Sequence, residues 1–85
     1  MKINIIEKLR KKVDKVDGKL VHLTAERFRL TKEIISLKKI NGLGIKDRSR
    51  EESILKEVAQ LAKKLRIDQG IVVNIFKSIL RESKK

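Results

Sequence analysis

The sequence predicts an all-α protein built from three helices, one long and two shorter. Apolar residues return every three or four positions through most of the chain, which is the spacing of helices and not of strands. The chain has no proline, and its one strong breaker before residue 66 is Asn41-Gly42-Leu43-Gly44. A length of 85 residues allows a single domain, residues 1–85. One copy of so short a chain is expected to be only marginally stable.

The first helix is expected over residues 3–40. Its apolar stripe consists of Ile6, Leu9, Val13, Val16, Leu20, Leu23, Leu30, Ile34 and Leu37. The spacing alternates between three and four residues, which is a heptad pattern. A helix of this extent is about 55–60 Å long. Asn41-Gly42 supplies a stop that tolerates the left-handed backbone conformation.

The second helix is expected over residues 48–65 and the third over residues 69–83. Asp47 and Asp68 are suitable N-cap residues, and Glu51 suits the positive end of the second helix. The buried face of the second helix consists of Ile54, Leu55, Val58, Leu61, Ala62 and Leu65. The stripe of the third consists of Val72, Ile75, Phe76, Ile79 and Leu80.

The lengths of these helices predict an intertwined homodimeric helical bundle. The two shorter helices, each about 25 Å long, can cover the first only if they lie nearly end to end. Even then the wider apolar face of the first helix stays open; it includes Ile5, Val21, Phe28 and Ile35. A second copy related by two-fold symmetry completes such a face. A monomeric three-helix hairpin is the alternative.

Composition limits the partners and the chemistry. The 23 Lys and Arg against 11 Asp and Glu give a net charge of +12, which favours anionic partners. The chain has no cysteine for disulfides or thiolate metal sites, and His22 alone cannot build a metal cluster or a catalytic dyad. Without a signal peptide or a long apolar run, we expect a cytoplasmic protein. Enrichment in lysine and glutamate is typical of thermostable proteins.

Arg27 interrupts the stripe of the first helix between Leu23 and Leu30. An unpaired buried guanidinium costs several kcal/mol, so Arg27 is expected to meet an anion. That anion could be a ligand, or it could be Glu26, Glu33 or an acid of a partner chain. Arg27 could also be a polar residue that sets the register of a helical assembly.

Other polar residues extend the apolar stripes. Lys38 lies 11 residues after Arg27, so the two point within about 20° of each other and their backbones are about 16 Å apart. Arg50 precedes the stripe of the second helix, and Ser83 continues that of the third. Polar groups at the ends of three apolar stripes suggest a polar pocket inside a helical bundle.

Arg10 lies too far along the first helix to share that pocket within one chain. It precedes Arg27 by 17 residues, which is roughly 100° around the helix and over about 20 Å along it. An antiparallel partner could bring its own Arg10 to the pocket. The alternative is a surface arginine in the basic run of residues 8–12.

Four motifs combine these residues in one order. They are R-x3-D-x2-D from Arg10, E-R at Glu26-Arg27, K-x8-D-x2-R-E from Lys38 to Glu51, and I-F-x6-S from Ile75 to Ser83. In this order, over nearly the whole chain and without a gap, the sequence resembles the all-helical chorismate mutases, the AroQ class. Each motif alone is weak, whereas the set is specific.

The resemblance implies a dimer of three-helix chains with two sites, each completed by Arg10 of the partner subunit. The reaction would be the [3,3] rearrangement of chorismate to prephenate, which leads to phenylalanine and tyrosine. The family needs no cofactor, no metal and no covalent intermediate. The expected small-molecule partner is therefore chorismate, a dianion, and neither nucleic acid nor membrane is expected as a partner.

The resemblance also assigns roles. Arg27 and the partner's Arg10 would hold carboxylates through forked hydrogen bonds, and Lys38 would donate to the ether oxygen as negative charge grows there. Glu51 would accept from the substrate hydroxyl, helped by the backbone near Asp47. The remaining two residues are Arg50, which would order this end of the site, and Ser83, which would hold the ring carboxylate.

One family position has no counterpart in this sequence. A Gln or Glu four residues after the serine would fall at position 87, beyond Lys85. Lys38 is then the sole expected donor to the ether oxygen. We therefore expect weak activity, because losing one such donor costs roughly 10²–10³ in turnover.

Three other functions remain open. A related helical family removes pyruvate from isochorismate but lacks an acid at the position of Glu51. A basic nucleic-acid binder fits the charge, although the chain has only two aromatic residues for stacking and no motif of the common nucleic-acid modules. A coiled-coil adaptor fits the heptad stripe and would tolerate Arg27→Leu.

Overall fold

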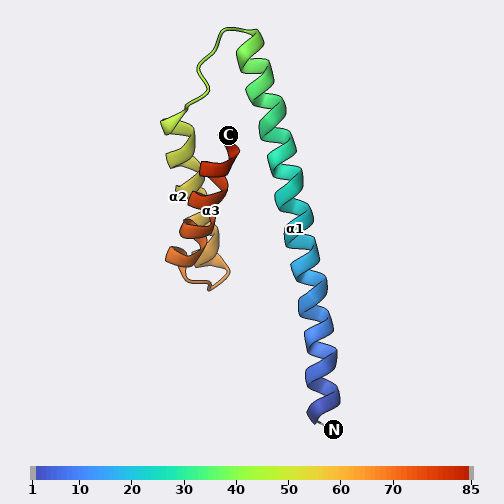
Figure 1. Cartoon of the computed structure of the whole chain (residues 1–85). Coiled ribbons are helices and arrows are strands. Elements are labelled where there is room, and N and C mark those ends of the chain that lie inside the picture. Colours follow the sequence, from blue (N-terminus) through green and yellow to red (C-terminus); the bar gives the residue numbers. More distant parts are fainter. Residues whose placement is uncertain (1, 85) are drawn as a thin grey trace. The chain divides into compact units, whose positions relative to one another are not determined.

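The computed structural model describes residues 2–84, and every regular element in that range is a helix (Figure 1). The helices are α1 (Lys2–Ile40), α2 (Arg48–Lys64) and α3 (Gln69–Ser83). Their ends lie within one residue of the limits expected from the sequence, and the all-α fold class is confirmed. The chain divides into two units, one ending at Leu30 and the other beginning at Thr31, and each is described by itself.

Most of α1 belongs to the first unit, and its apolar stripe is exposed. Val16 is 53% exposed and Leu20 is 58% exposed. The other seven stripe residues are also exposed: Ile6, Leu9, Val13, Leu23, Leu30, Ile34 and Leu37. No residue of α1 that the structure describes is fully buried. An exposed apolar stripe of this length is typical of surfaces that bind another protein.

The C-terminal end of α1 is a Schellman turn centred on Gly42. The backbone N–H of Leu43 donates to the carbonyl of Lys38 over 2.7 Å, and that of Gly42 donates to Lys39 over 3.2 Å. Gly42 has φ +67°, the left-handed region in which glycine lacks the Cβ penalty. The stop expected at Asn41-Gly42 is therefore confirmed.

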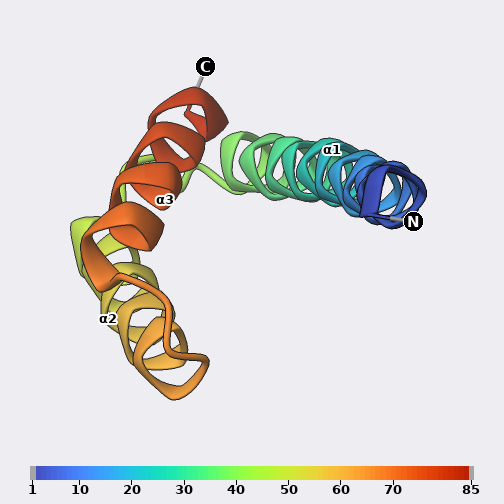
Figure 2. The same cartoon turned by 90° about the horizontal axis from the view of Figure 1, so that it is seen from below.

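In the second unit, α2 and α3 lie side by side as an antiparallel pair (Figures 1 and 2). Ile54 and Ala62 of α2 and Leu80 of α3 are buried, and Val58 and Phe76 are half-buried. Ala62, at 2% exposure, has a side chain small enough for the two backbones to approach closely. Residues 65–68 make the connection, so the start of α2 lies beside the end of α3.

Both shorter helices begin at the expected caps. The Asp68 carboxylate accepts a hydrogen bond from the backbone N–H of Ile71 over 3.1 Å. The corresponding contact of Asp47 at α2 belongs to the candidate site described below. No helix within residues 2–84 combines the length and the apolar composition that crossing a membrane requires.

Candidate functional site

The first turn of α2 carries two of the expected site residues, Arg50 and Glu51, and a third, Asp47, caps it. The Asp47 side chain accepts from the backbone N–H of Arg50 over 2.9 Å, which satisfies one of the free donors at the helix start. The N-cap role expected for Asp47 is confirmed. This contact fixes the first turn, and with it the directions in which Arg50 and Glu51 leave the helix.

The last turn of α3 carries Ser83, which is half-buried. Its hydroxyl donates to the carbonyl of Ile79 over 2.6 Å, one turn earlier in the helix. The oxygen keeps its lone pairs as acceptors while it donates in this way. Ser83 therefore lies on the continuation of the buried stripe of α3, as the sequence indicated.

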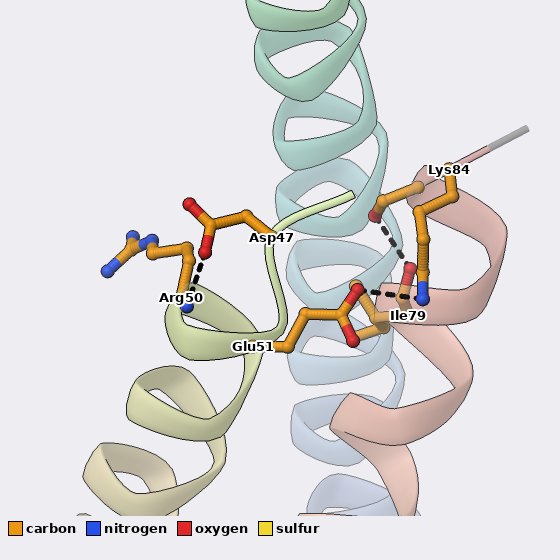
Figure 3. A network of polar contacts seen from close by, with 6 residues as sticks. Asp47, Arg50, Glu51, Ile79 and Lys84 are labelled. Carbon is orange, nitrogen blue, oxygen red and sulfur yellow. Dashed lines mark hydrogen bonds and ion pairs between the residues drawn. The ribbon is translucent and has the colours of Figure 1, made fainter. Parts of the chain in front are cut away.

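Glu51 and Lys84 join these two helix ends through an ion pair (Figure 3). The Lys84 ammonium lies 2.7 Å from Oε1 of Glu51, and the two side chains are 37% and 27% exposed respectively. Each charge also suits its helix end, because the start of α2 is the positive end of a helix dipole and the end of α3 is a negative end. The pair therefore combines a short charge-assisted hydrogen bond with two favourable helix-end positions.

Arg50 leaves α2 on the other side from Glu51. In Figure 3 its guanidinium extends away from Lys84 and Ile79, whereas the Glu51 carboxylate extends toward them. Arg50 is exposed, in contrast to the half-buried Glu51. The structure therefore brings Glu51, Ser83 and Lys84 together at one end of the α2–α3 pair. The ordering role of Arg50 remains a prediction.

The cations expected from α1 are found on that helix in different surroundings. Lys38, in the last turn, is half-buried. Arg27 is also half-buried, and its side chain interacts with neighbouring groups of the protein. The Arg10 side chain is 72% exposed and pairs with Glu7 over 3.1 Å, as expected for a surface arginine within one chain. Arg10 and Arg27 belong to the first unit, so their distances from Glu51 and Ser83 also remain predictions.

Lys84 is the residue of this cluster that sequence reasoning missed. The available signal was the antiparallel arrangement of two helices joined by a short connection. Glu51 and Lys84 lie at similar distances from the connection at residues 65–68, so such a pair places them opposite each other.

The chemistry of this end of the helix pair suits a small polar anion. Glu51 offers an acceptor for a hydroxyl donor, and the Ser83 hydroxyl offers a donor for a carboxylate when it turns away from the Ile79 carbonyl. A small organic acid that also carries a hydroxyl matches this set of groups.

Comparison with known proteins identifies relatives over almost the whole chain. The family described as chorismate mutase type II matches residues 9–85. A chorismate mutase of Methanocaldococcus jannaschii is 36% identical over 83 residues, which cover 94% of this chain and 84% of that protein. A bifunctional chorismate mutase/prephenate dehydratase of Escherichia coli strain K12 is 31% identical over 88% of this chain but only 19% of its own length. A bifunctional protein of the same description from Buchnera aphidicola (Acyrthosiphon pisum) is 32% identical over 87% of this chain and 19% of its own length.

Proposed function

The chain belongs to the chorismate mutase type II family, and we propose that it catalyses the intramolecular rearrangement of chorismate to prephenate. In this proposal residues 1–85 form a single catalytic domain, and the enzyme is an isomerase. The bifunctional relatives are matched over only a fifth of their length, so the dehydratase part of their names is not carried over. The observation that carries the proposal is the family match over residues 9–85, which includes every proposed site residue.

The geometry at the α2–α3 end supports this proposal. Glu51 is half-buried and paired with Lys84, the residue after Ser83. An acceptor for a hydroxyl and a serine hydroxyl that can turn to a carboxylate therefore lie at the same end of the helix pair. Chorismate carries both kinds of group on one skeleton. Glu51 accepts from its hydroxyl, the backbone near Asp47 supports that contact, and Ser83 binds the ring carboxylate. Arg50 orders the same end from the outer side of α2.

The cations of α1 bind the substrate carboxylates and stabilise the charge that develops on the ether oxygen. Arg27 of one chain and the partner subunit's Arg10 bind the two carboxylates and hold the substrate in the chair-like conformer. The rate enhancement therefore comes partly from orientation of the substrate. Lys38 donates to the ether oxygen, where negative charge develops as the C–O bond breaks. Because these contacts strengthen in the transition state, they raise turnover and not only affinity.

We also propose that the active protein is an intertwined homodimer. The nine exposed stripe residues of α1 form an apolar face that is interrupted at Arg27, and a second copy of the same helix would bury it. An antiparallel partner carries its Arg10 toward the other chain's Arg27, which a single straight helix cannot do. The exposed pair of Arg10 with Glu7 is weak, so Arg10 is readily released to bind a carboxylate.

The direct test is to incubate the purified protein with chorismate and to follow the loss of its diene absorbance. We expect turnover in the unmodified protein and its loss in Arg27→Ala and Lys38→Ala. Isochorismate is the comparison substrate, because a lyase of the related helical family would consume it faster. Absence of turnover with chorismate at any protein concentration would refute the proposal, and faster consumption of isochorismate would replace it with the lyase function.

A further inference from the structure

The ion pair between Lys84 and Glu51 has no place in the mechanism described above, yet it engages one of its proposed groups. Lys84 is the C-cap residue of α3, and Glu51 lies in the first turn of α2. The distance of 2.7 Å is that of a charge-assisted hydrogen bond and not of a loose surface pair. The contact therefore acts on the carboxylate that is expected to meet the substrate hydroxyl.

The contact restricts a side chain that otherwise has several free rotations. A glutamate loses side-chain entropy when it is fixed, and an acceptor that is already oriented loses less of it on binding. The Glu51 side chain is 27% exposed, so packing against its surroundings limits it only in part. The ammonium of Lys84 supplies the missing restraint from the facing helix.

The contact also leaves the carboxylate able to accept a second hydrogen bond. Lys84 engages Oε1, and each carboxylate oxygen has its own acceptor positions. An ionised carboxylate only accepts, so a hydroxyl donor is the matching substrate group.

We propose that Lys84 is a positioning residue of the site, whose ammonium holds the Glu51 carboxylate by Oε1 so that Oε2 accepts the hydroxyl of the substrate. This inference rests on the proposed function. It assigns to the residue after Ser83 a role in substrate binding that acts through Glu51.

The test compares three variants of the full chain in the chorismate assay. Lys84→Met removes the charge at similar length, Lys84→Arg restores a cation, and Lys77→Met removes an exposed charge from the same helix as a matched control. The hydroxyl contact is made in substrate and transition state alike, so its loss raises KM more than it lowers kcat. We expect KM to rise about three- to tenfold in Lys84→Met. Lys84→Arg should bring KM most of the way back to the value of the unmodified protein, and Lys77→Met should leave KM unchanged.

A double-mutant cycle with Glu51→Gln separates positioning from direct contact with the substrate. If Lys84 acts through Glu51, Lys84→Met has no further effect on KM in the Glu51→Gln background. An equal effect of Lys84→Met in both backgrounds would overturn the inference, as would an unchanged KM in the single variant. Thermal unfolding and sedimentation of each variant identify a folding defect. A rise in KM that accompanies lost stability, and that Lys84→Arg does not reverse, also counts against the inference. An unmodified protein without turnover would overturn the proposed function and this inference together, whereas an active protein with an indifferent Lys84 overturns only the inference.

Discussion

The backbone N–H of Ile67 donates to the carbonyl of Ala62 over 2.9 Å, closing α2 with the same kind of turn that ends α1. Arg66 donates to Lys63 over 3.2 Å within this turn, and its φ is +58°. The corresponding position after α1 is Gly42. A side chain with a Cβ is strained in this left-handed region. The end of α2 therefore carries backbone strain at Arg66 that the end of α1 avoids with Gly42, although the hydrogen bonds of the two turns match.

Arg66→Gly should therefore stabilise the protein. Relief of the Cβ strain outweighs the added freedom of the unfolded chain, and we expect a gain of about 0.5–1 kcal/mol in the free energy of unfolding. Chemical denaturation at a fixed protein concentration measures it. Gly42→Ala is the reverse experiment and should lose about 1 kcal/mol. A destabilising Arg66→Gly would show that the arginine side chain contributes more than its backbone costs.

The N-cap of α2 gives a second prediction. Asp47→Ala removes the acceptor for the backbone N–H of Arg50, and the expected loss is about 1 kcal/mol in the free energy of unfolding. Asp47→Asn keeps an acceptor of the same shape and should lose only a few tenths. Denaturation monitored by circular dichroism distinguishes the two. Equal losses in both variants would mean that the carboxylate charge, and not the hydrogen bond, stabilises the helix start.

The packing of α2 on α3 gives a third prediction. Ile54 is buried against α3, so Ile54→Ala leaves a cavity that this small core can close only in part. The expected loss is about 2–4 kcal/mol. Ile3→Ala is the control, since Ile3 is 74% exposed and should change stability by less than about 0.5 kcal/mol. Similar losses at the two positions would contradict the assignment of the core to the α2–α3 pair.

These helix ends explain what the sequence could predict. Asp47, Asp68 and Gly42 act on backbone groups within a few residues, so their roles can be recognised locally. Arg66 could not be recognised, because a non-glycine residue in the left-handed region has no sequence signature. Lys84 was missed for another reason: its contact with Glu51 depends on the register of one helix against another, and the charge pattern of a single helix does not contain it.

The expected assembly gives a fourth prediction. Val16 lies in the middle of the exposed stripe of α1, and Val16→Glu would place a charge in the proposed dimer interface. We expect sedimentation to show a dimer of the 9.9 kDa chain for the unmodified protein, and the variant to dissociate at least about a hundredfold more readily. Lys15→Glu introduces the same residue at a neighbouring exposed position outside the stripe and should leave the dimer intact. A monomeric unmodified protein would contradict the proposed assembly.

The fifth prediction concerns Arg27, the position at which the apolar stripe of α1 is interrupted. Arg27→Leu completes the stripe, and replacing a charge that is partly removed from water by an apolar side chain is often neutral or stabilising. We expect a folded dimer with an unchanged or higher melting temperature. The same change removes the forked donor for a substrate carboxylate, so kcat/KM should fall by roughly 10²–10³.

Arg29→Leu is the matched control for this last prediction, because Arg29 is an exposed arginine two residues away on the same helix. It should keep the chorismate mutase activity of the unmodified protein. If Arg27→Leu also keeps that activity, the arginine has no part in the reaction, and a helical adaptor becomes the better explanation of the stripe. If Arg27→Leu unfolds instead, its guanidinium pairs with an acid of the protein itself, because only a lost internal partner leaves an uncompensated charge behind. A stable but inactive dimer is the outcome that assigns Arg27 to substrate binding, since the protein then loses function without losing structure.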